Sequence, residues 1–132
     1  AMELRVTSQV LKALEEAARR ALPKEACGVL LGEGAAVSRF VETRNVHPSP
    51  QTHFAIDPQE LVDTHRTARE GGPHVLGYFH SHPKGPARPS KTDESQAAGD
   101  GKFWAIWGEG ELKFWRDDPS GFREVSYMAH DS

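Results

Sequence analysis

Near the start of the chain, apolar residues recur every three or four positions, which is the spacing of an amphipathic helix. They are Val10, Leu11, Leu14, Ala17, Ala18 and Ala21. Thr7 or Ser8 can cap this helix at its beginning, and Pro23 stops it. The pattern therefore predicts a helix that runs from Ser8 to about Ala21 and buries one apolar face.

A second helix is expected in the middle of the chain. Asp57 is a suitable N-cap, and Pro58 suits the first helical position because its missing N–H is not needed there. Residues 71–73 (GGP) end the helix. The sequence thus predicts a helix from Pro58 to about Arg69.

Short apolar or alternating runs between the helices are typical of strands. We expect strands over Cys27–Leu31, Ala36–Thr43, His53–Ile56, His74–Ser81, Phe103–Trp107, Leu112–Arg116 and Phe122–Tyr127. His74–Ser81 is apolar as far as Phe79, as a central strand buried on both faces would be. From Met128 onward we expect a frayed tail. Interleaved strands and helices indicate an α/β (α+β) fold, a mixed β-sheet with helices packed on its faces.

Length and charge narrow the class of protein. The 132 residues suit one domain, expected over residues 2–132 because Ala1 before Met2 resembles a remnant of tag cleavage. The formal charge is −3 without blocks of like charge, which argues against nucleic acid or an anionic membrane as a partner. No apolar run is long enough to span a bilayer, and the sequence lacks a signal-peptide pattern. We therefore expect a cytoplasmic protein.

Cys27 is the only cysteine, so neither an intrachain disulfide nor a cysteine-based zinc cluster can form. We interpret it as a small buried residue rather than a nucleophile. Aromatic residues concentrate in the expected hairpin near the C-terminus: Phe103, Trp104, Trp107, Phe114 and Trp115. Most should belong to the core, whereas an exposed pair would form a protein-binding patch.

Metal-binding chemistry is suggested by the end of the expected central strand. His80 and His82 are two residues apart and so project from the same face. A proline-rich loop follows, and Asp93 then returns as a third ligand. Two histidines and a carboxylate with an open fourth position are typical of a catalytic zinc site. The plainer alternative is a pair of surface histidines at a strand end.

Ser90 and Asp93 also have a structural interpretation. Ser-x-x-Asp resembles a capping box at the start of a short third helix, expected over Asp93–Ala98 with Ser90 or Thr92 as its cap. Capping and metal binding use different lone pairs, so both roles can coexist.

Glu25 stands just before the first expected strand, where a lone glutamate is usually a solvated charge. A zinc hydrolase, however, needs a group that accepts a proton from water and donates one to the leaving amine. Neither His80 nor His82 can do this while it binds metal. A carboxylate on a neighbouring strand edge could.

The spacing H-x-H-x(7)-S-x-x-D, from His80 to Asp93, resembles the signature of the JAMM (MPN+) metalloproteases. Residues 23–32 (PKEACGVLLG) resemble the glutamate-bearing segment of that family, and the order of elements is similar over nearly the whole chain. The resemblance implies the JAMM/MPN fold, which is similar to the cytidine-deaminase-like architecture. It also implies that His80, His82 and Asp93 hold one Zn²⁺. Glu25 would be general base and then general acid, and Ser90 would donate a hydrogen bond to the oxyanion or the bound water.

This resemblance implies a zinc-dependent peptidase or isopeptidase of the compact prokaryotic type. Its partner would be a ubiquitin-like or sulfur-carrier protein adduct, or a peptide, and an extended Gly-Gly tail could add as a strand at a sheet edge. A homodimer is compatible with this interpretation. The alternative is a non-catalytic MPN-type interaction module with a metal-stabilised loop, which would need a fourth protein ligand. A zinc deaminase is disfavoured because it needs a Cys pair such as P-C-x-x-C.

Overall fold

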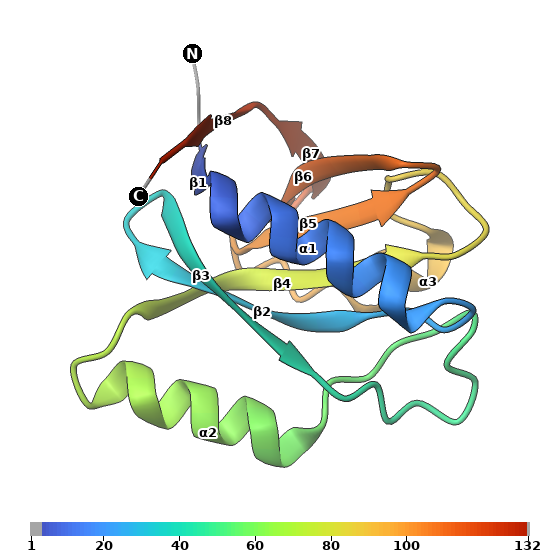
Figure 1. The fold of residues 1–132 in the computed structure, drawn as a ribbon, viewed down its shortest axis with the longest axis horizontal. Coiled ribbons are helices and arrows are strands. Elements are labelled where there is room, and N and C mark those ends of the chain that lie inside the picture. The colour runs from blue at the N-terminus through green and yellow to red at the C-terminus, as the bar shows by residue number, and fades with distance from the viewer. Residues whose placement is uncertain (1–3, 132) are drawn as a thin grey trace.

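The structure is a computed structural model that describes residues 4–131. Within that range one mixed sheet holds eight strands in the spatial order β7-β6-β5-β4-β2-β3-β1-β8 (Figure 1). The strands are β1 (Leu4–Thr7), β2 (Cys27–Glu33), β3 (Ala36–Thr43), β4 (His74–His82), β5 (Phe103–Gly108), β6 (Glu111–Asp118), β7 (Gly121–Val125) and β8 (Tyr127–His130). The helices are α1 (Ser8–Ala21), α2 (Pro58–Arg69) and α3 (Lys91–Gln96). Ala1 and Met2, on which the expected start of the domain depends, lie outside the described residues.

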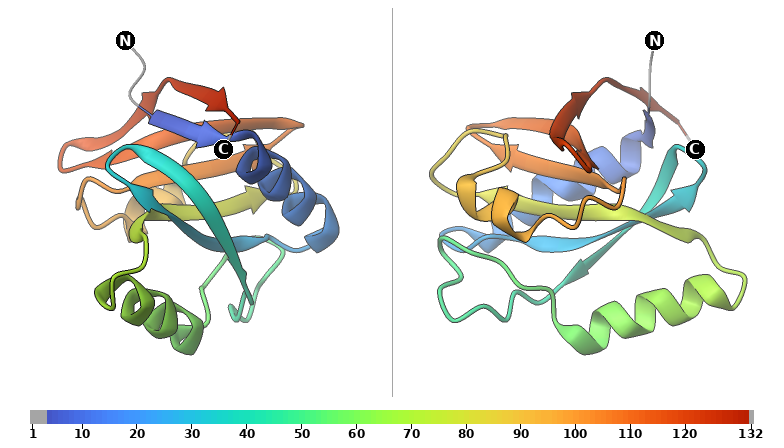
Figure 2. Two further views of the ribbon diagram at one scale, coloured as in Figure 1. Left: turned by 60° about the vertical axis from the view of Figure 1, so that its left-hand side comes forward. Right: turned by 180° about the vertical axis from the view of Figure 1, so that it is seen from behind.

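The main core lies between α1 and one face of the sheet. Thr7 caps α1 by accepting a hydrogen bond from the Val10 amide, 3.1 Å away. The buried residues of α1 are Val10, Leu14, Ala17 and Ala18, as the helical spacing predicts. In Figure 2, α3 lies on the opposite face of the sheet from α1, while α2 runs beside the sheet and leads into β4. The face opposite α1 is therefore where the end of β4 and the start of α3 meet.

β4 is the central strand that its sequence predicts. It pairs with β2 in antiparallel and with β5 in parallel direction, and its residues Phe79, His80 and Ser81 are buried. The predicted β5–β6 hairpin is also present, with Phe103, Trp104, Trp107 and Phe114 buried in it. The core interpretation of these aromatic residues is confirmed, and no fully exposed pair forms there. No helix within residues 4–131 is long and apolar enough to cross a membrane.

Three predictions about elements are wrong in whole or in part. The expected strand over His53–Ile56 is a loop that makes a single bridge, between Ile56 and Asn45. The expected last strand ends at Val125, and the expected frayed tail instead forms β8, which pairs in parallel with β1. The third helix begins earlier than predicted, at Lys91, because Ser90 is its cap.

Candidate active site

The end of β4 brings two imidazoles together on the face opposite α1. Alternation along the strand places His80 and His82 on the same side, with their Nε2 atoms 3.1 Å apart. The side chain of His80 is fully buried, and that of His82 is 11% exposed. One side of the pair therefore faces the protein interior, and the other faces solvent.

Asp93 completes the cluster from the first turn of α3. Its Oδ2 atom lies 3.0 Å from His80 Nε2 and 3.2 Å from His82 Nε2. The predicted capping box is present as well. The Ser90 amide donates to Asp93 Oδ2 at 2.9 Å, and the Asp93 amide donates to Ser90 Oγ at 3.1 Å. The cap thus holds the Asp93 carboxylate against both imidazoles.

These three side chains fit a divalent cation by the chemistry of their donor atoms. The His82 Nδ1–H faces the Pro86 carbonyl oxygen at 2.8 Å, so it donates there and leaves the Nε2 lone pair toward the cluster. One ligand atom from each of His80, His82 and Asp93 lies within 4.8 Å of the others, and within residues 4–131 no fourth histidine, cysteine or acidic residue joins them. Two imidazole nitrogens and one carboxylate oxygen suit zinc and leave one coordination position for water or substrate.

The loop between β4 and α3 is shaped by the neighbouring strands β5 and β6. A Cβ added at Gly108 would collide with the backbone of Gly85, Pro86 and Ala87, so only glycine allows this close approach. Trp115 Nε1 donates to the Ala87 carbonyl oxygen at 3.1 Å. The loop that presents the Pro86 carbonyl to His82 therefore packs against β5 and is hydrogen-bonded to β6.

Glu25 lies just before β2 and is buried, with 6% of its surface exposed. Its neighbour Ala26 is joined to Ser81, the residue between the two histidines. The Ala26 amide donates to Ser81 Oγ at 2.8 Å, and the Ser81 amide donates to the Ala26 carbonyl at 3.1 Å. Ser81 thereby joins the glutamate segment to the end of β4 that carries His80 and His82. Ser81 is not among the residues that the sequence pattern predicts for the site, although a serine within an apolar strand is a signal for such a role.

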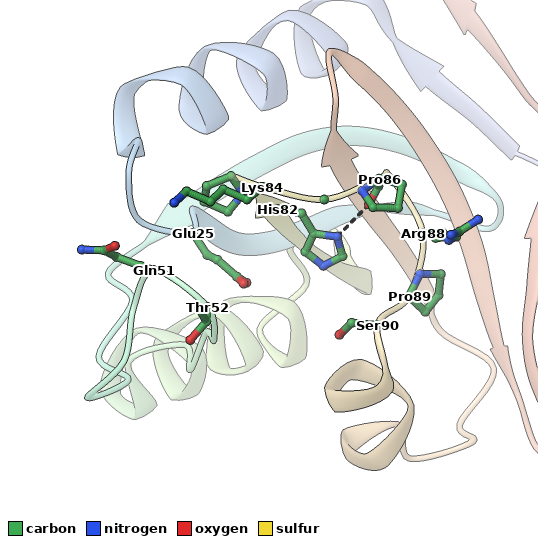
Figure 3. A pocket seen from close by; sticks show the side chains of 11 residues that line it. Glu25, Gln51, Thr52, His82, Lys84, Pro86, Arg88, Pro89 and Ser90 are labelled. Carbon is green, nitrogen blue, oxygen red and sulfur yellow. Dashed lines mark hydrogen bonds between the residues drawn. The ribbon is translucent and has the colours of Figure 1, made fainter.

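A cleft of about 370 Å³ opens between Glu25, His82 and the proline-rich loop. Figure 3 shows Glu25 and Ser90 pointing into this cleft from opposite sides, whereas Lys84 and Arg88 point away from it. Of the side chains predicted for chemistry, Glu25, His82 and Ser90 thus line this cleft, and His80 and Asp93 contact His82 within the cluster.

Burial and charge set the protonation of these groups. Burial raises the pKa of Glu25 to about 7; the Asp93 carboxylate also raises it, and His82 opposes the shift. Burial lowers the pKa of His80. The pKa of Asp93 lies well below its usual range, because the contacts of its carboxylate with His80 and His82 outweigh the cost of burial. Near neutral pH, Asp93 is therefore an anion and Glu25 is poised between its two forms.

Cys27 lies at the start of β2 and is fully buried. Burial raises the pKa of its thiol to about 11, and Thr43 Oγ1, 3.5 Å from the sulfur, only partly offsets this shift. The thiol therefore stays protonated near neutral pH, which confirms that Cys27 is a buried structural residue.

Residues 7–118 match a family described as prokaryotic homologs of the JAB domain. The chain is a member of this prokaryotic JAB family. The resemblance to JAMM proteins that the histidine–serine–aspartate spacing indicates is thereby confirmed.

Several proteins with sequences similar to this prokaryotic JAB protein have peptidase names. A probable TtuB-protein conjugate cleaving protease from Thermus thermophilus is 41% identical over 59% of this chain and 52% of its own length. A desampylase from Haloferax volcanii is 32% identical over 89% of this chain and 86% of its own length. A CysO-cysteine peptidase from Mycobacterium tuberculosis is 34% identical over 67% of this chain and 61% of its own length. The match therefore spans only about half to two thirds of two of these three relatives.

Solved structures agree with the fold of the prokaryotic JAB protein. A protein from Desulfitobacterium hafniense superposes with a TM-score of 0.84 at 31% identity, covering 98% of this chain and 94% of that one. A JAB1/MPN domain protein from Archaeoglobus fulgidus gives a TM-score of 0.67 at 23% identity, covering 97% of this chain and all of that one. The latter likeness confirms the JAB1/MPN fold class that the sequence indicates.

Proposed function

We propose that this protein is a zinc-dependent peptidase or isopeptidase that removes adducts from the C-terminal tail of a ubiquitin-like or sulfur-carrier protein. Family membership and the peptidase names of its relatives support an enzyme of the JAMM type. The metal, the roles of individual residues and the substrate are our proposal. One observation carries it: His80, His82 and Asp93 form one cluster, and His82 of that cluster lines a cleft together with the buried Glu25.

In this proposal His80 and His82 hold the metal through Nε2, and Asp93 holds it through a carboxylate oxygen. A bound zinc ion would supply a Lewis acid that polarises the scissile carbonyl and lowers the pKa of a water molecule. The Pro86 carbonyl keeps the His82 ring in the required tautomer, and the Ser90 amide supports the Asp93 carboxylate. These supporting contacts are made by the chain itself.

Glu25 would move the proton that hydrolysis requires. Its carboxylate accepts a proton from the attacking water, and the resulting carboxylic acid gives that proton to the departing nitrogen. In the metal-free protein burial raises the pKa of Glu25 to about 7, and a carboxyl group with a raised pKa is the better proton acceptor while it still gives the proton back near neutral pH. The proton taken up in the first step is released in the second, so the enzyme returns to its starting state.

Ser90 is suited to stabilise negative charge on the substrate oxygen. Its Oγ accepts the Asp93 amide hydrogen, which leaves the hydroxyl hydrogen available to donate into the cleft. A donor that faces the developing oxyanion typically contributes about 10²-fold or more to the rate. In this proposal Ser90 therefore both caps α3 and assists the reaction.

The substrate class is supported by what the relatives are named for: TtuB-protein conjugates, desampylation and CysO-cysteine. The cleft lies along the proline-rich loop after β4, and we infer that a chain terminus without side chains, such as a Gly-Gly tail, enters it.

The decisive experiment combines metal analysis with hydrolysis of a defined conjugate. The probe is a ubiquitin-like protein ending in Gly-Gly that is joined by an isopeptide bond to a fluorescent lysine peptide. We expect zinc-loaded protein to contain about one zinc per chain and to cleave the probe. Asp93→Ala should lose most of its zinc, and Glu25→Gln should keep its zinc but lose hydrolysis by roughly 10²–10⁴-fold.

Exposed acids on the same elements provide matched controls. Glu94 is an exposed neighbour of Asp93 on α3, and Glu33 is exposed at the far end of β2. Glu94→Ala and Glu33→Gln should keep both zinc and activity. Full activity of Glu25→Gln would refute the role of Glu25, and parent protein that takes up no zinc on reconstitution would refute the proposal itself.

A further inference from the structure

The loop between β3 and α2, residues 44–57, forms one wall of the active-site cleft and is organised around one side chain. We propose that Asn45 is a positioning residue, which holds the Glu25 backbone and the Phe54 ring in place through this loop. The inference rests on the proposed function, because positioning matters only if Glu25 does the chemistry.

The Asn45 side chain makes four short hydrogen bonds and one longer contact to backbone groups. Its Nδ2 donates to the carbonyl oxygens of Glu25 at 3.1 Å and His53 at 3.0 Å, and the Pro50 carbonyl oxygen lies 3.5 Å from the same nitrogen. Its Oδ1 accepts from the amides of His47 at 3.1 Å and Ala55 at 3.0 Å. One half-buried amide therefore joins four points of the loop to the segment that carries the general base.

Both backbone polar groups of Glu25, its amide and its carbonyl, form hydrogen bonds with the loop of residues 44–57. The Glu25 amide donates to the Pro50 carbonyl at 2.7 Å, and the Glu25 carbonyl accepts from Asn45. Glu25 lies before the first residue of β2, so the sheet ladder does not fix its backbone. Because backbone direction sets where the side chain points, the loop fixes the direction of the carboxylate.

The same loop covers His80. The Phe54 ring stacks on the His80 imidazole with ring centroids 4.3 Å apart and planes inclined by 16°. Asn45 holds both residues that flank Phe54, through the His53 carbonyl and the Ala55 amide. Asn45 is thus linked through backbone groups to Glu25 on one side and, through Phe54, to the His80 imidazole on the other. It is not itself one of the residues that would bind metal or transfer a proton.

Asparagine is suited to this role because it donates and accepts through one short, rigid group. Aspartate has the same shape and keeps the accepted bonds from His47 and Ala55. It cannot donate to the carbonyl of Glu25, Pro50 or His53. Asn45→Asp therefore removes the link to Glu25 while it keeps the size of the side chain, and Asn45→Ala removes every link without adding charge.

The test compares these two variants with the parent enzyme in three measurements. We expect zinc content to stay at the parent level, because all three proposed ligands lie on β4 and α3. On the conjugate probe, kcat should fall roughly 10–100-fold, because a shift of about 1 Å in a catalytic group has that effect. The KM should stay within about threefold. In metal-free protein, hydrogen exchange at the Glu25 amide should accelerate by more than exchange in β5.

Asp57→Ala is the matched control for a general loss of stability. Asp57 lies at the other end of the same loop, caps α2 through the Gln59 amide at 2.9 Å and pairs with Arg44. Its removal should lower the unfolding temperature but leave kcat and exchange at the Glu25 amide near the parent values.

Two outcomes would overturn the inference while leaving the proposed function intact. In the first, the Asn45 variants are folded and zinc-loaded and cleave the probe with the kcat of the parent. The second is variants whose kcat and Glu25 exchange change no more than those of Asp57→Ala. Failure of the zinc-loaded parent itself to cleave the probe would instead overturn the proposed function.

Discussion

The Glu25 carboxylate lies where water has little access, because only 6% of the residue is exposed. The negative charge of Asp93 is close enough to raise the pKa of Glu25 further. Such a position costs free energy whenever the group is ionised. The cost makes sense if the glutamate has to hold a proton near neutral pH. In the metal-free protein the same cost should appear as a pH dependence of stability.

The sign follows from the two pKa values of Glu25. Folding raises its pKa from 4.5 to about 7, so the folded state binds the proton more tightly than the unfolded state does. Its stabilising contribution is complete below pH 4.5 and is lost as the pH rises to about 7. Glu25→Gln should therefore raise the free energy of unfolding of metal-free protein by about 1–3 kcal/mol at pH 8, and by little at pH 4.5.

Urea denaturation at the two pH values measures this difference. Glu16→Gln serves as the control, since Glu16 is an exposed glutamate on α1 whose replacement should leave the pH dependence unchanged. An equal effect of Glu25→Gln at both pH values would show that the carboxylate is solvated in the folded state, and the argument for its raised pKa would fail.

At this scale the sequence predicts the residues of the cluster better than those that support it. His80, His82 and Asp93 follow from spacing, because strand alternation and a capped helix are local features. Asn45 gives no such signal. Its contacts reach residues 20 positions before it and 10 after it, and only the folded loop brings them together.

Among the elements, β5 has a function that its apolar sequence does not reveal. Its last residue, Gly108, lies against the backbone of Gly85, Pro86 and Ala87. The loop that orients His82 through the Pro86 carbonyl therefore packs against the end of β5, where Gly108 has no side chain to keep it away. Prolines make the loop stiff, but the contact with β5 decides where it lies.

Gly108→Ala should displace this loop and weaken the hydrogen bond from His82 Nδ1 to the Pro86 carbonyl. Loss of a contact that orients a ligand lowers metal affinity by about 10–100-fold, and we expect a decrease in that range. Competition with a chromogenic zinc chelator gives the affinity directly.

Gly32→Ala is the control for this variant. Gly32 is also a buried strand glycine whose added Cβ would meet backbone, at Ala36, but it lies at the end of β2 away from the cluster. It should lower stability and leave zinc affinity unchanged. Equal affinities for parent and Gly108→Ala would mean that the loop does not depend on β5.

Elements with local start and stop signals were predicted closely. The bounds of α2 follow from Asp57, Pro58 and the glycines after Glu70. The segment from His53 to Ile56 has the composition of a strand, yet it forms a single β-bridge, between Ile56 and Asn45. Strand formation needs a neighbouring edge, and that information lies elsewhere in the chain.

At the scale of the whole molecule, the first and last described strands close one side of the sheet together. β8 pairs in parallel with β1, from Leu4 with Tyr127 to Thr7 with His130. The sequence favoured a frayed end from Met128, because terminal residues are often poorly ordered. The pairing with β1 could not be read locally, since the partner strand is more than 100 residues away. Tyr127, however, lies against the core, with its ring centroid 4.7 Å from that of Phe114.

This arrangement predicts that the C-terminal segment stabilises the fold without taking part in the chemistry. Tyr127→Ala removes the contact with Phe114 and should lower the free energy of unfolding by about 1.5–3 kcal/mol, less than for a fully buried aromatic residue. Met128→Ala, at an exposed neighbouring position, should change it by less than about 0.5 kcal/mol. Zinc content should be unchanged in both variants, because the cluster lies on β4 and α3. If Tyr127→Ala unfolded at the same urea concentration as Met128→Ala, β8 would be an adherent tail rather than a part of the cooperative fold.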